Sequence, residues 1–231
     1  MNKKNLILVA LVICSSFLFS GCGKKKTTTT ETKAIKQTAV ELELSNSEKP
    51  YISLIPRTDG HELTLKVNNI SSKITNAEYE LIYTAEDEGL EIEKGVNGTE
   101  KTINSSFEKK LLLGTESCTS GCKYKYDEGV TGGTLSITFT TDDNKFYKFE
   151  APFNIKNSTD IKKAGYLSLD SEGFKVSGTV TSKSYYFIVI KNASAYSIFS
   201  NGTGSGKISS IEPSTVTKSD KNTFVGDYLI Q

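Results

Sequence analysis

The chain has 231 residues, with 28 Lys or Arg against 27 Asp or Glu, so its formal net charge at pH 7 is +1. This balance argues against a general nucleic-acid binder, which needs a net basic surface to displace the counterions of the phosphate backbone. A single His and the absence of Trp also argue against a zinc site and against tryptophan stacking on sugars. We therefore expect no nucleic-acid partner, no metal and no cofactor.

The N-terminal segment has the organisation of an export signal. A short positive stretch over residues 2–5 precedes an apolar run over residues 6–19. This run is as long as the hydrophobic region of a secretory signal and shorter than the roughly 20 residues that a spanning helix needs. Ser20 and Gly21 are small residues of the kind found near a signal cleavage site.

The string Leu18-Phe19-Ser20-Gly21-Cys22 resembles a bacterial lipobox, with Phe19 where leucine is commoner. The resemblance covers residues 1–22 alone. It implies a bacterial lipoprotein with a signal peptide over residues 1–21, diacylglycerol on the sulfur of Cys22, and an extracytoplasmic position on the cell membrane. Two or three acyl chains would attach the protein stably to the membrane, since each buried methylene contributes roughly 0.8 kcal/mol to the free energy of binding. The alternatives are an uncleaved anchor or a secretory signal cut elsewhere.

A disordered tether is predicted over residues 22–48, because this segment has too few large apolar residues to bury a core. Loss of Lys3 and Lys4 with the signal lowers the 28 basic residues to 26, against 27 acidic ones, so the mature net charge is −1. Apolar residues alternate with charges over residues 40–44, which predicts a strand at the end of the tether.

The remaining chain is typical of an all-β protein. Short runs of β-branched and aromatic residues are separated by Gly, Asn and Asp, and no segment keeps a 3.6-residue apolar period over three turns. A first group of strands is predicted over residues 51–55, 61–67, 79–83, 90–93, 107–113, 134–140 and 146–153.

Turns are predicted within this group at residues 86–89, 96–99 and 142–144, the second on its Asn-Gly pair. The acidic residues of the first and third turns offer oxygens of the kind that bind calcium. Neither matches the EF-hand loop pattern, so we interpret both as solvated turns.

The strand pattern breaks at residues 157–160, and a second group of strands follows. These strands are predicted over residues 166–169, 174–180, 185–191, 196–199, 208–211 and 224–230, with a flexible loop at 201–206.

We predict an immunoglobulin-like β-sandwich over residues 49–156 and a smaller β-sandwich domain over residues 157–231. The first is large enough to hold a complete core, and the second is close to the size at which a core is marginal. The alternative is that the second group of strands extends the first into one larger domain.

Cys118 and Cys122 flank the sequence Thr-Ser-Gly. An exported protein lies in an oxidising compartment, and Gly121 allows the chain to fold back, so we predict a Cys118–Cys122 disulfide. The alternatives are a redox pair or half of a metal site. The spacing differs from C-x-x-C, and only one His is present to complete a zinc set.

Strand alternation after the second cysteine places Tyr124 and Tyr126 on one face and Lys123 and Lys125 on the other. Tyrosine gives contact area at low entropic cost, so these four residues are predicted to form a binding surface. The alternative is that both tyrosines pack on the sandwich core. His61 is interpreted as a surface histidine, because no motif of a catalytic partner occurs.

These features predict a non-catalytic binding or structural module that is attached to the membrane by its N-terminal lipid and meets an unknown protein or glycan. The alternatives are a hydrolase of envelope polymers or an accessory carbohydrate-binding protein. A solute receptor is disfavoured, because the chain lacks βαβ spacing. A deep pocket with perturbed carboxylates near His61 would favour the enzyme, and exposed tyrosines would favour the binding module.

The substitution Cys22→Ser tests the lipid anchor. We expect the precursor to stay unacylated and to be cleaved inefficiently, because the sulfur that carries the lipid is gone. Metabolic labelling with a radioactive fatty acid measures this, and lipid retained on the Cys22→Ser variant contradicts the assignment.

Overall fold

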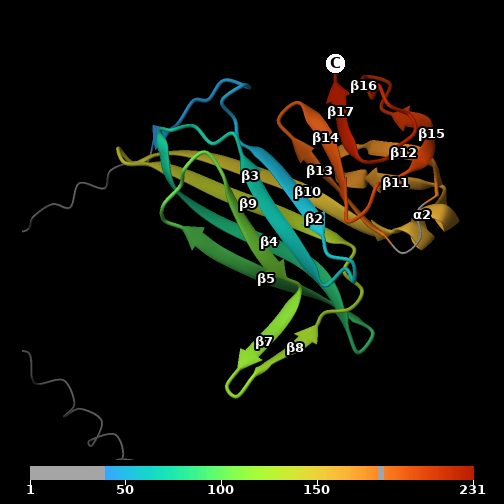
Figure 1. The fold of residues 1–231 in the computed structure, drawn as a ribbon. Helices are drawn as coiled ribbons and strands as arrows, with labels where there is room; N and C mark the ends of the chain where they lie inside the picture. The colour runs from blue at the N-terminus through green and yellow to red at the C-terminus, as the bar shows by residue number, and fades with distance from the viewer. Residues whose placement is uncertain (1–39, 182–184) are drawn as a thin grey trace, which may run out of the picture. The chain divides into compact units, whose positions relative to one another are not determined.

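The computed structural model describes residues 40–181 and 185–231. The predicted signal peptide, Cys22 and most of the predicted tether therefore lie outside the described residues. The described part consists of β-sheets and a single short α-helix (Figure 1). The predicted all-β sandwich is confirmed.

The framework is a nine-stranded sheet that contains strands from both predicted groups. Its main strands lie in the order β16 (Val216–Thr217), β17 (Gly226–Ile230), β14 (Ala195–Ser200), β13 (Tyr186–Asn192), β10 (Lys145–Asn157), β9 (Gly132–Thr141), β4 (Ile74–Asp87) and β5 (Leu90–Glu100).

The ninth strand, β1 (Val40–Glu41), pairs in parallel with the start of β10. Leu42 follows it into the core. The strand predicted at the end of the tether is therefore confirmed, and the predicted limit of the tether at residue 48 is wrong. The apolar residues at alternate positions are the physical reason, because they let this short segment join the sheet.

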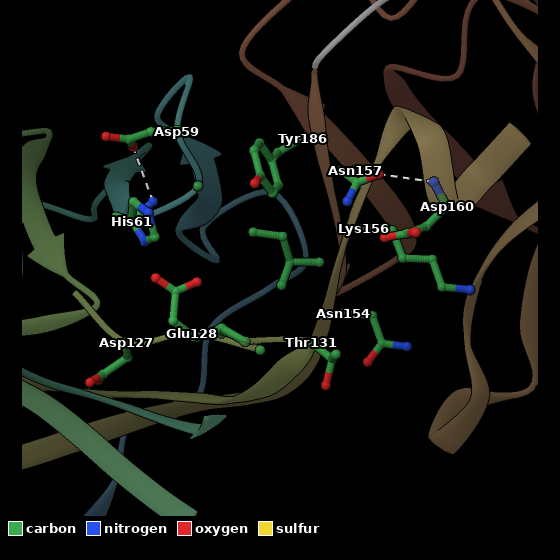
Figure 2. A pocket seen from close by; sticks show the side chains of 14 residues that line it. Asp59, His61, Asp127, Glu128, Thr131, Asn154, Lys156, Asn157, Asp160 and Tyr186 are labelled. Carbon is green, nitrogen blue, oxygen red and sulfur yellow. Dashed lines mark hydrogen bonds between the residues drawn. The ribbon is translucent and has the colours of Figure 1, made fainter. Parts of the chain in front are cut away.

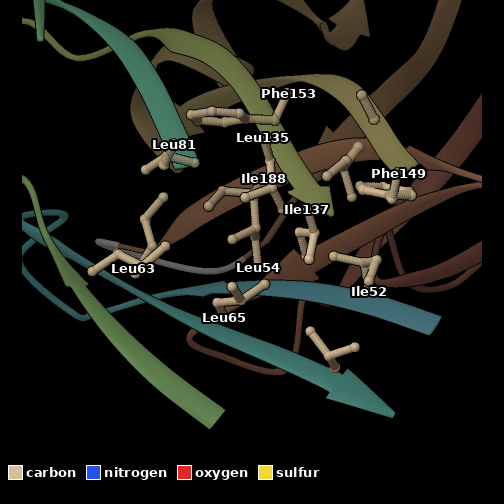
Figure 3. Packing of buried hydrophobic residues seen from close by; sticks show 14 of the residues in the cluster. Ile52, Leu54, Leu63, Leu65, Leu81, Leu135, Ile137, Phe149, Phe153 and Ile188 are labelled. Carbon is tan, nitrogen blue, oxygen red and sulfur yellow. The ribbon is translucent and has the colours of Figure 1, made fainter. Parts of the chain in front are cut away.

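A three-stranded sheet covers one face of the framework. It contains β2 (Tyr51–Pro56), β3 (Glu62–Asn68) and β6 (Phe107–Leu112). Alternate residues of these strands face alternate residues of the framework and form the first core. Figure 3 shows this packing for Ile52, Leu54, Leu63, Leu65, Leu81, Leu135, Ile137, Phe149, Phe153 and Ile188.

A second three-stranded sheet lies over the other end of the framework. It contains β11 (Tyr166–Leu169), β12 (Phe174–Val180) and β15 (Gly206–Glu212), and the 3-10 helix Asp170–Glu172 joins its first two strands. The helix α2 (Ser158–Ala164) packs beside it.

The predicted break at residues 157–160 is the start of α2. The Asn157 side chain caps this helix by accepting the Asp160 N–H at 2.9 Å, and Gly165 ends the helix with a φ of 81°.

The two cores meet at β13. Ile188 and Ile190 belong to the first core, whereas Phe187 and Val189 belong to the second. Successive side chains of a strand point to opposite faces, so the two sheets that cover the framework lie on its opposite sides. β13 pairs with β10, and the described residues belong to one compact unit. The sheet therefore continues across the predicted domain boundary, and whether each group of strands folds alone stays a prediction.

A polar network also joins the two groups of strands. The Asn192 side chain donates to the Ile52 carbonyl at 3.0 Å and accepts the Ile52 N–H at 3.1 Å. It also donates to Ser197 at 2.8 Å, and both Ser197 and Tyr51 donate to Asp227, at 2.6 and 2.7 Å. Burial raises the pKa of Tyr51 to about 12. Asn192 thus gives β2 the partner that a neighbouring strand would supply.

Most predicted strands correspond to observed ones, and the turns at 86–89 and 142–144 join β4 to β5 and β9 to β10. The turn predicted at 96–99 is wrong, because β5 continues through these residues. Glycine is needed at position 98 because the Tyr79 side chain lies against it: a Cβ there would lie 2.3 Å from the Tyr79 hydroxyl oxygen.

Asn192→Ala should lower the free energy of unfolding by about 2–4 kcal/mol, because the N–H and carbonyl of Ile52 would be left unpaired in a buried place. Urea denaturation of the two proteins measures the difference. Asn46→Ala is the control, since Asn46 lies in an exposed turn and its side chain accepts a hydrogen bond from Lys49. The control should stay within about 0.5 kcal/mol of the wild type, and an equal effect of the two substitutions contradicts the role of Asn192.

Candidate binding site

β7 (Gly114–Cys118) and β8 (Cys122–Tyr126) form a two-stranded hairpin that extends from the framework (Figure 1). Within the described part of the chain, it pairs with no other strand. A two-stranded hairpin is marginally stable by itself. The Cys118–Cys122 disulfide closes its tip, with the two Cα atoms 4.1 Å apart, which agrees with the predicted pairing.

The metal alternative for these cysteines has little chemical basis. Among the described residues, one group of His, Cys, Asp or Glu lies close enough to share an ion, namely Glu116 with Cys118 and Cys122. The two sulfurs are bonded to each other. A single carboxylate is left to bind a metal, which is too few ligands for a structural zinc.

A buried carboxylate holds the base of the hairpin. Asp127 accepts hydrogen bonds from the Tyr83 hydroxyl, at 2.7 Å, and from the Lys94 ammonium, and its side chain is 4% exposed. Its N–H donates to the Leu113 carbonyl at 3.0 Å. Burial and the bond to Asp127 raise the pKa of Tyr83. The two ends of the hairpin are thereby tied to each other and to β4 and β5.

The exposed face of the hairpin carries a row of stacked rings. The ring centroids of Tyr124 and Tyr126 are 6.0 Å apart, and those of Tyr126 and His61 are 4.5 Å apart with an interplanar angle of 8°. We call His61, Tyr126 and Tyr124 the aromatic row. Tyr124 is 50% exposed, and its hydrogen bond to Glu116 raises its pKa. The alternative that both tyrosines pack on the core is wrong, because neither belongs to a core cluster.

The two lysines of the predicted surface lie on the opposite face of β8. Lys123 and Lys125 are exposed and stand across from Ser117 and Thr115 of β7. The structure therefore brings the four predicted residues together on one hairpin but divides them between two faces.

Arg57 supports the aromatic row from the neighbouring turn. Its guanidinium carbon lies 5.5 Å from the centroid of the Tyr126 ring. Two hydrogen bonds of 2.8 Å join it to Asp59, and a third, of 3.2 Å, joins it to Glu62. The guanidinium holds the pKa of Asp59 below its usual range. Asp59 also accepts the backbone N–H of His61 at 3.1 Å, which positions the third ring.

A cleft of about 420 Å³ lies beside His61 (Figure 2). Its walls are the turn at residues 59–61, the loop at residues 127–131, the end of β10 with the first turn of α2, and Tyr186. Gly60, with a φ of 78°, permits this arrangement, because a Cβ there would lie 2.6 Å from the Tyr186 ring. The cleft and the aromatic row thus share His61.

Comparison of the chain with known proteins gives no relative: no family model, no curated protein and no solved structure matches it. In residues 40–181 and 185–231, no helix is both long and apolar enough to cross a membrane. The inference of function therefore depends on the site itself.

Sequence reasoning identified the hairpin residues and missed the cleft. Glu128 and Tyr186 lie far apart in the sequence and carry no local motif. The sequence feature that could have pointed to the cleft is the pair of glycines in its walls. Gly60 and Gly129 both have a positive φ, and a neighbouring side chain lies close to each of them. Glycine in a turn does not say which side chain approaches it.

Asp127→Asn should destabilise the protein by about 1.5–3 kcal/mol, because the Tyr83 and Lys94 donors lose a charged acceptor. Thermal and urea unfolding measure the loss. Asp142→Asn, in the exposed turn between β9 and β10, makes the same chemical change without a buried partner and should have an effect below about 0.5 kcal/mol. Equal stability of the two variants contradicts the anchoring role of Asp127.

Proposed function

We propose that this protein is a membrane-anchored, extracytoplasmic module that binds its partner, a protein or a glycan of the envelope, through the aromatic face of the β7–β8 hairpin. The observation that carries the proposal is the aromatic row, which is ordered by stacking and exposed at its Tyr124 end. Tyrosine side chains provide large contact area with little loss of conformational entropy.

The supports of the hairpin favour binding, because a surface that is already ordered loses less entropy when its partner docks. The disulfide restrains the tip, and Asp127 restrains the base. These restraints act on a segment that contributes no residue of β7 or β8 to either core. A purely structural hairpin would have little need of an ordered aromatic face.

The cleft gives weaker support to the alternative of an envelope-polymer hydrolase. Asp59 accepts the backbone N–H of His61, and the ring nitrogens make no hydrogen bond to any described residue, so no carboxylate pairs with the imidazole as in a catalytic triad. The low pKa of Asp59 keeps this carboxyl ionised, which does not suit a general acid. Binding is therefore the better interpretation of the same residues.

The lipid anchor rests on the lipobox resemblance of residues 18–22. Of the predicted tether over residues 22–48, residues 22–39 precede the first described strand and lie outside the described residues. A flexible chain of this length reaches about 25 Å, enough to separate the folded part from a bilayer surface.

Tyr124→Ala should weaken capture of the envelope partner at least about 10-fold, because exposed aromatic anchors dominate interfaces of this kind. The measurement is quantitative affinity capture from envelope extract, with the bound component identified by mass spectrometry in the wild type and quantified in each variant. Leu229→Ala is the matched control, since Leu229 is 56% exposed and lies on β17.

The control should retain wild-type capture. Equal capture by the Tyr124→Ala variant and the wild type contradicts the hairpin as the binding surface. Loss of capture in both variants also contradicts it, because the effect would then not be specific to the aromatic row.

A further inference from the structure

We infer that the cleft beside His61 binds a small polar ligand that carries a primary ammonium group. This inference goes beyond the proposed function, because it concerns the cleft and not the exposed face of the hairpin. The cleft volume of about 420 Å³ lies within the range of about 300–1,000 Å³ that small-molecule sites occupy.

The cations beside the cleft are already engaged with other groups. Arg57 forms two hydrogen bonds with Asp59, and Lys94 pairs with the buried carboxylate of Asp127. Each of these acidic groups is thereby compensated within the protein.

Lys156 also lines the cleft, but its ammonium group forms no ion pair with the Glu128 carboxylate among the described residues. Its ammonium lies 4.6 Å from the centroid of the Tyr166 ring, where it makes a cation–π contact. Figure 2 shows its side chain directed away from Glu128.

Besides Asp160, in the first turn of α2, the remaining acidic group of the lining is the exposed Glu128 carboxylate. It lines the cleft and points toward the side where His61 and Tyr186 lie (Figure 2). Among the described residues it has no side-chain hydrogen bond and no ion pair. Glu86, another carboxylate, stands opposite it across an isolated bridge in which the Glu86 N–H donates to the Glu128 carbonyl at 2.8 Å. Like charges that stand directly opposite each other on paired strands are destabilising, and a bound cation would offset their repulsion.

This charge distribution selects among ligands. A neutral ligand that covered Glu128 would remove water from an ionised group and offer nothing in exchange, which is costly. An ammonium group offsets that cost with a charge-assisted hydrogen bond. The Tyr186 ring adds an aromatic face that attracts a cation.

Further groups in the cleft suit a ligand with hydroxyls beside its amine. The hydroxyls of Tyr186 and Thr131 and the ring nitrogens of His61 have no hydrogen-bond partner within residues 40–181 and 185–231. They line the same cleft as Glu128. An amino sugar presents the matching groups, and a short diamine presents the ammonium groups alone.

The test compares charged probes with their neutral counterparts on the full-length chain in a neutral detergent. Glucosamine and cadaverine are titrated by calorimetry and by NMR, beside N-acetylglucosamine and N,N′-diacetylcadaverine. We expect at least one amine to bind at least about 5-fold more tightly than its acetylated form. Glu128→Gln should weaken that binding about 10-fold or more, equivalent to about 1.4 kcal/mol.

Glu91→Gln is the matched control, because Glu91 is an exposed carboxylate on β5 that does not line this cleft. It should change the Kd less than about 2-fold. Equal binding of the amines and their acetylated forms overturns the inference, as do an unchanged Kd in the Glu128→Gln variant and the absence of saturable amine binding up to about 10 mM. The Glu128→Gln variant should still capture the hairpin's partner, so failure here is distinguishable from failure of the proposed function.

Discussion

The architecture depends on one strand that is buried on both faces. β13 supplies Ile188 and Ile190 to the first core and Phe187 and Val189 to the second, and it pairs with β10 on one edge and β14 on the other. Each fully buried apolar side chain of this size contributes about 1.5–3 kcal/mol. Because the two covering sheets lie on opposite sides of the framework, neither core can be completed without this strand. Asn192, at its end, adds the polar connection to β2.

This arrangement leaves the residues of the β7–β8 hairpin outside both cores. Its order comes from few contacts: a disulfide at the tip, the Asp127 carboxylate at the base, and stacking along Tyr124, Tyr126 and His61. The same His61 borders the cleft, and the Arg57–Asp59 pair positions it from the turn before β3. The aromatic row and the cleft therefore share His61 and the turn that carries it.

Much of the fold could be predicted from local pattern. Apolar residues at alternate positions, such as Leu63, Leu65 and Val67, predict both a strand and its buried face, because successive side chains of a strand point to opposite sides. The apolar run at 187–190 is likewise typical of a doubly buried strand. The Asn97-Gly98 pair led to a wrong turn prediction for a physical reason. The glycine is required because the Tyr79 side chain of the neighbouring strand lies against it, and the local sequence does not reveal this contact.

By itself, the sequence determined the all-β class, most strands, the cysteine pair and the alternation of tyrosines and lysines in β8, because these depend on neighbours in the chain. The tertiary structure decided which residues meet. It placed His61 against Tyr126, 65 positions later, Asn192 against Ile52, and Glu128 in a cleft with Tyr186. It also decided that the sheet continues past residue 157. Such contacts follow from strand order and from the opposite faces of the framework, which the energetics of the whole fold select and no short stretch encodes.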